Sequence, residues 1–183
     1  MDILRQADFS VYKENAKDFM ADDTAFTLAN YEKCKRIGAI PELLLFYRFS
    51  EGSVTAKYNP KRIDNSVNIH VFSMDMLNRI NDTAEESRHY VDNVFLASII
   101  EACKLLFASD NPYSYKVGEV RRVVETEVMK DLMGKSKEAV SVLRTIIEYV
   151  LAETQKCTNI TTEDVEQLKY INGLLKIYMA EGE

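Results

Sequence analysis

VFLASIIEACKLLFA, residues Val94–Ala108, is the most apolar stretch of this 183-residue chain and predicts the helix at the centre of its core. Only a narrow strip of small or polar residues interrupts its apolar surface: Ala97, Ser98, Glu101, Lys104 and Ala108. A helix that is apolar on nearly every side is normally buried by its neighbours. The run of about 15 residues is shorter than the roughly 20 apolar residues of a membrane-spanning helix. We therefore expect a core helix and no membrane partner.

Helical periodicity continues on both sides of this stretch, through residues 74–183. Capping and turn residues divide the region, with Ser73 before its first helix, Ser136 before a later one, and Thr161 or Thr162 before the last. We expect a short helix at 74–80 and four longer ones at 83–108, 115–133, 137–156 and 162–180. These predict a bundle of about four helices.

Residues 1–73 have a different pattern. Two helices are expected first, at 10–20 and at 22–37, with Gly38 ending the second. Short runs separated by turn residues then predict three strands, at 43–49, 54–58 and 67–71. In the third run, apolar residues alternate with Asn68 and His70, which is typical of a strand with one polar face.

The sequence thus predicts an α+β fold that is mostly helical. A C-terminal bundle of about four helices carries an N-terminal helical pair and a three-stranded antiparallel β-meander packed on it. The length fits a single domain over residues 1–183, made of the pair plus meander at 1–73 and the bundle at 74–183.

Composition favours a cytoplasmic protein. The apolar fraction of 46% and the charged fraction of 28% are ordinary for a globular protein. Cys34, Cys103 and Cys157 are far apart and form no Cys-x-x-Cys pair, so neither a disulfide framework nor a zinc site is indicated. The N-terminus is too polar for a signal peptide. We expect a reducing cytoplasm, that of the host if the protein is viral, and no metal or cofactor.

Charge is unevenly distributed along the chain. The net charge is −6, yet residues 33–62 hold seven basic and two acidic residues and are locally about +5. Basic side chains beside aromatic rings are what a single-stranded nucleic-acid surface uses. The candidate residues for binding nucleic acid or an acidic protein partner are Arg48, Lys57, Tyr58, Lys61 and Arg62. The alternative is an ordinary charged sheet edge.

Catalytic motifs are scarce, since the chain has two histidines and no phosphate-binding or nucleophile-elbow motif. Glu86 and His89 have the Glu-x-x-His spacing of a metal-binding helix face, but no second copy of the motif exists. Glu101 would be a functional candidate if it were buried, because burial raises a carboxyl pKa. A local pair with Lys104 is the alternative.

The last two helices carry more apolar surface than one buried stripe requires. In the final helix, one stripe faces the core and a second lies on another side. We predict that the second stripe is an interface, formed by Tyr170, Leu174, Ile177 and Tyr178. The alternative is that these helices lie between two layers of the fold.

From these features we expect a non-enzymatic interaction or assembly subunit that oligomerises or docks through its C-terminal helical hairpin. Its partner would be another protein or a second copy. A viral or phage assembly protein, or a host-modulating adaptor, fits this profile. Two alternatives stay open: a nucleic-acid-binding protein that uses the basic meander, and a small helical metal-dependent enzyme.

Overall fold

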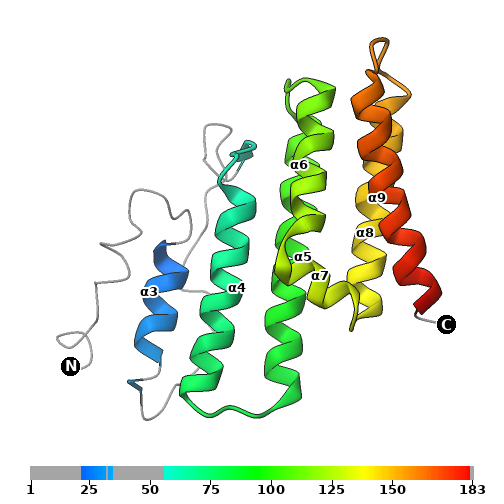
Figure 1. The fold of residues 1–183 in the computed structure, drawn as a ribbon. Helices are drawn as coiled ribbons and strands as arrows, with labels where there is room; N and C mark the ends of the chain where they lie inside the picture. Colours follow the sequence, from blue (N-terminus) through cyan, green and yellow to red (C-terminus); the bar gives the residue numbers. More distant parts are fainter. Residues whose placement is uncertain (1–21, 32, 35–55, 182–183) are drawn as a thin grey trace, which may run out of the picture. The chain divides into compact units, whose positions relative to one another are not determined.

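The computed structural model describes residues 22–31, 33–34 and 56–181, and every regular element in these ranges is helical (Figure 1). The chain divides into two compact units, Met1–Val91 and Asp92–Glu183. The helices are α3 (Asp22–Tyr31), α4 (Arg62–Arg79), α5 (Glu85–Ala108), α6 (Tyr113–Glu125), α7 (Glu127–Met133), α8 (Lys137–Thr154) and α9 (Thr162–Glu181). None of them combines the length and the apolarity that crossing a membrane requires. A single domain over 1–183 stays a prediction.

The predicted α+β class is wrong, because the described residues contain helices and no strand. Residues 67–71, expected as the third strand, lie inside α4. The alternation over five residues suggested a strand, but Ile69, Ser73 and Met76 also follow helical spacing. The helical pattern extends over more residues than the alternation does, and the segment is helical. Ser73 is buried within α4 instead of capping a helix at 74–80.

The rest of the predicted meander lies mostly outside the described residues. This holds for the strand at 43–49 and for the first residues of the strand at 54–58. The described residues 56–58 form no strand. The helix at 10–20 and Gly38 also lie outside, and α3 ends at Tyr31, earlier than the predicted 37.

In the N-terminal unit, α3 packs on α4. α4 ends in a turn at Asn81, whose φ of 56° is left-handed and suits asparagine. The amides of Asn81 and Asp82 donate to the carbonyls of Asn78 and Leu77, which satisfies the last turn of the helix. The Asp82 carboxylate then accepts from Ala84 N and Ser87 Oγ, which starts α5 close to the predicted position.

The apolar stretch of α5 supplies core to the C-terminal unit, as its sequence predicts. Its buried residues there are Phe95, Leu96, Ile99, Ala102, Cys103 and Leu106. The helix is not enclosed on every side, since Val94 is 41% exposed.

The C-terminal unit is a helical bundle, which confirms that prediction. α9 packs on both α6 and α8, and α6 also contacts α8 (Figure 1). The single helix predicted at 115–133 is interrupted at Thr126, which ends α6 and caps α7 by accepting from Met129 N. Ser136 caps α8 as expected, by accepting from Ala139 N.

Candidate functional site

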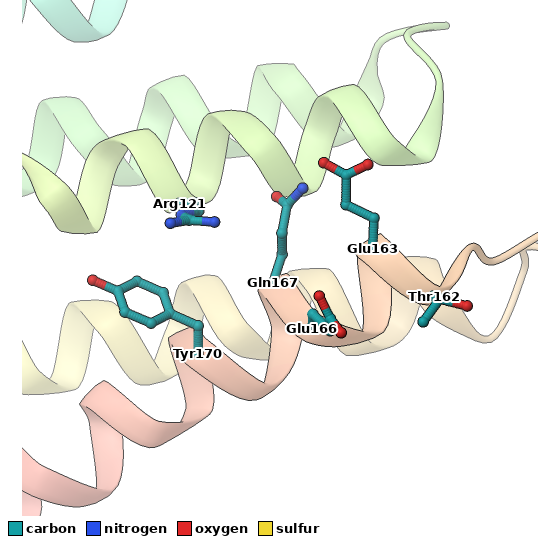
Figure 2. A pocket seen from close by; sticks show the side chains of 6 residues that line it. All are labelled: Arg121, Thr162, Glu163, Glu166, Gln167 and Tyr170. Carbon is teal, nitrogen blue, oxygen red and sulfur yellow. The ribbon is translucent and has the colours of Figure 1, made fainter.

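A groove of about 530 Å³ runs between α6 and α9 in the C-terminal unit. One of its lining residues comes from α6 and the others from α9. They are Arg121, Thr162, Glu163, Glu166, Gln167 and Tyr170. Figure 2 shows Glu163 and Gln167 extending from α9 toward α6, with Arg121 lying over Tyr170.

The start of α9 is fixed by a reciprocal cap between Thr161 and Asp164. Asp164 N donates to Thr161 Oγ1 at 3.2 Å, while Asp164 Oδ2 accepts from Thr161 N at 2.9 Å and from the Thr161 hydroxyl at 2.8 Å. This capping box satisfies backbone groups that a helix start otherwise leaves unpaired. It confirms the predicted N-terminus of α9.

Among the residues that the structure describes, Arg121 is the only basic one that lines the groove. Its guanidinium carbon lies 4.9 Å from the centroid of the Tyr170 ring, and its Nε donates to Glu125 Oε1 at 2.9 Å. The hydrogen bond to Glu125 raises the pKa of Arg121. Because one carboxylate and one aromatic face already engage this cation, Arg121 adds little uncompensated positive charge to the groove.

Glu163 and Glu166 give the groove an acidic end. Both side chains are exposed, and neither makes a salt bridge within 4 Å in the part of the chain that the structure describes. Gln167 lies behind them, with its Oε1 buried near Gly118 and accepting no hydrogen bond from a described residue. Because the Gln167 oxygen is buried, the carboxylates of Glu163 and Glu166 are what this end of the groove offers to hydrogen-bond donors of a ligand.

The four predicted interface residues divide into two pairs. Tyr170 is 39% exposed, at the groove where Arg121 of α6 lies over its ring, and Ile177 is 53% exposed, so both present apolar surface to solvent. Leu174 and Tyr178 are half-buried. The structure thus places two of the four at the surface, while their role in binding stays a prediction.

Of the residues predicted to bind nucleic acid or an acidic partner, those that the structure describes lie in no strand. Lys57 is exposed and precedes α4, Tyr58 is half-buried, Lys61 is the N-cap residue of α4, and Arg62 is its first residue. Arg48 lies outside the described residues. Binding of nucleic acid or of an acidic partner at these residues stays a prediction that no longer has a β-meander to support it.

The residues considered for metal chemistry lie at the surface. Glu86 and His89 are exposed near the start of α5, and no group of three or more metal-ligating side chains occurs among the residues that the structure describes. The Glu101 side chain is 55% exposed and lies 3.7 Å from Lys104 Nζ, so the local pair is confirmed.

Sequence reasoning missed a buried polar cluster at the C-terminal end of α8. Lys116 is only 4% exposed, and its Nζ donates to Glu153 Oε1 at 2.8 Å and to Phe107 O at 3.1 Å. The hydrogen bond from Lys116 lowers the pKa of Glu153. No local signal could have found this pair, because the two residues are 37 positions apart.

Tyr113 belongs to the same cluster. The Thr154 hydroxyl donates to Val150 O, so its hydrogen is used, and Tyr113 must donate to Thr154 Oγ1. Burial raises the pKa of Tyr113, which keeps its hydroxyl protonated and able to donate. The cluster joins α6 to α8 and to the end of α5, and its groups are engaged with one another.

Comparisons with protein-family models, with curated proteins and with solved structures found no match to this chain.

Proposed function

We propose that this protein is a non-enzymatic interaction module that docks onto another protein through the exposed side of α9. The observation that supports the proposal is the exposure of Tyr170 and Ile177, at 39% and 53%, on a helix that already packs on α6 and α8. Large apolar side chains that stay exposed together beside a groove are typical of association surfaces. Because Cys34, Cys103 and Cys157 are free thiols, as is usual in a reducing compartment, we place the module in the cytoplasm.

Site-specific photo-crosslinking in the cells that make the protein tests this proposal. A photoreactive amino acid at Ile177 should give a discrete higher-mass adduct, while the same group at Glu148, an exposed residue of α8 outside the groove, should not. Adducts in equal yield from both positions, or from neither, would contradict docking through α9. The mass of the adduct reports whether the partner is a different protein or a second copy.

A further inference from the structure

We infer that the partner presents an amphipathic helix that packs antiparallel to α9 and carries lysine or arginine in its last turns. This inference rests on the proposed function, because it names the kind of protein that docks on α9. It is carried by one line of exposed residues along that helix, which begins at the groove and continues past it.

These residues follow alternating spacings of three and four along α9, and we call them the α9 seam. They are Glu163, Glu166, Tyr170, Gly173, Ile177 and Ala180. Alternating spacings of three and four residues, 3.5 on average, are typical of the residues through which one helix contacts a second helix packed alongside it. Gly173 is half-buried and the other members of the seam are exposed, so the line is open to a partner, with Arg121 of α6 lying over the Tyr170 ring at one edge.

Gly173 is the second feature that favours a helix as the occupant. Glycine is among the least favourable residues for a helix interior, and Gly173 lies well inside the 20-residue α9. Apart from its chain neighbours and the backbone of its own helix, no described residue has an atom within 4 Å of the position where a Cβ would stand, so packing within the unit does not require glycine there. A notch between Tyr170 and Ile177 instead allows close approach of another helix backbone.

The charges on the α9 seam indicate which residues the partner carries and in which direction its helix runs. The first two residues of the α9 seam, Glu163 and Glu166, are carboxylates without a salt bridge in the described ranges, and the remaining seam residues are uncharged. Lysine and arginine are favoured in the last turn of a helix, where they complement its dipole. An antiparallel partner would bring that turn against the two carboxylates and its apolar residues against Tyr170 and Ile177.

Binding of synthetic helical peptides to the full chain tests the inference. The probe is a peptide of leucine, alanine and glutamine, of about 20 residues, with three lysines in its last two turns; the reference peptide has glutamate in place of lysine. We expect the lysine peptide to bind about tenfold more tightly or better, and less tightly at high salt. Equal binding of the two peptides, or binding of neither, would overturn the inference.

One matched pair of variants and one further variant locate the binding on the α9 seam. Glu166→Lys should weaken binding of the lysine peptide about tenfold, while Glu148→Lys, the same charge change on α8, should alter it less than about twofold. Gly173→Leu should abolish binding by filling the notch, while the melting temperature of the free protein is unchanged or higher because nothing lies above Gly173. Equal effects of the two charge reversals, or unchanged binding by Gly173→Leu, would contradict the inference.

The two proposals can fail separately. A crosslink from Ile177 to a different protein, without selective binding of the lysine peptide, leaves docking on α9 intact and makes the basic partner helix wrong. If light scattering shows a homodimer and Gly173→Leu dissociates it, the occupant of the α9 seam is a second copy of this chain. That result also contradicts the inference that the partner carries a basic helix. Absence of any crosslink contradicts the proposed function itself.

Discussion

Lys116 Nζ lies 2.8 Å from Glu153 Oε1, in an ion pair that joins α6 to α8. The lysine side chain is 5% exposed and the glutamate side chain 17% exposed. Lys116 also donates to Phe107 O near the end of α5, where a helix leaves carbonyls without intrahelical partners. One buried cation therefore links three helices of the C-terminal unit.

Removing this cation should destabilise the protein. Lys116→Met keeps most of the apolar stem but leaves Glu153 without its closest partner. Breaking a buried pair typically costs about 3–5 kcal/mol, and we expect about 2–3 kcal/mol here because Glu153 also contacts Lys156 at 3.3 Å. Urea unfolding of the variant and of the wild type measures the difference.

The same pair predicts a pH dependence. Because the pKa of Glu153 in the folded protein is lowered from its ordinary value of 4.5, the unfolded chain binds more protons just below that pH. The stability contributed by this pair is present above about pH 4.5 and falls as the pH drops through the folded pKa. Lys116→Met should reduce this acid-side loss of stability, and an unchanged pH profile would contradict the assignment.

The double variant Lys116→Met with Glu153→Gln should recover part of the stability that Lys116→Met loses, because no unpaired buried charge remains.

Thiol reactivity should separate the three cysteines. Burial raises the pKa of Cys103 to about 12, so its thiol stays protonated at pH 8. Cys34 and Cys157 are half-buried and all three thiols are free. Ellman's reagent should therefore modify two thiols in the native protein and the third only after denaturation. Cys103→Ala should leave the native count unchanged; rapid modification of three native thiols would contradict the burial of Cys103.

The cap of α9 should contribute measurably to stability. Thr161→Ala removes the hydroxyl that accepts from Asp164 N, and loss of such a cap typically costs about 0.5–2 kcal/mol. Thr162→Ala is the matched control, since this neighbouring threonine is exposed and its hydroxyl has no role in the cap. Thermal unfolding compares the two variants. Equal losses of stability in the two variants would show that the capping box of Thr161 and Asp164 does not stabilise α9.

Local signals in the sequence located most helix boundaries of the C-terminal unit. Ser136 and Thr161 cap helices because a side-chain oxygen accepts from an amide three residues ahead, an interaction within one turn. The same reasoning failed at Thr126, where a capping residue interrupts an apolar pattern that continues through it. It failed more seriously at 67–71, because five alternating residues are too few to separate a strand from a helix.

For the candidate site, the second apolar stripe indicated Tyr170 and Ile177 in advance, because a helix can turn only part of its circumference toward its neighbours. The groove with Arg121 could not be predicted in the same way, since it depends on how α6 and α9 pack.

The sequence alone therefore determined the elements whose energetics are local: the capped helices, the apolar stretch of α5 and the surplus stripe of α9. The tertiary structure decided which side chains meet. Lys116 and Glu153 are 37 positions apart, which is too far for local periodicity to relate them. Only the packing of α6 against α8 brings the two residues together. A contact between distant residues depends on the relative placement of whole helices, which capping and periodicity do not encode.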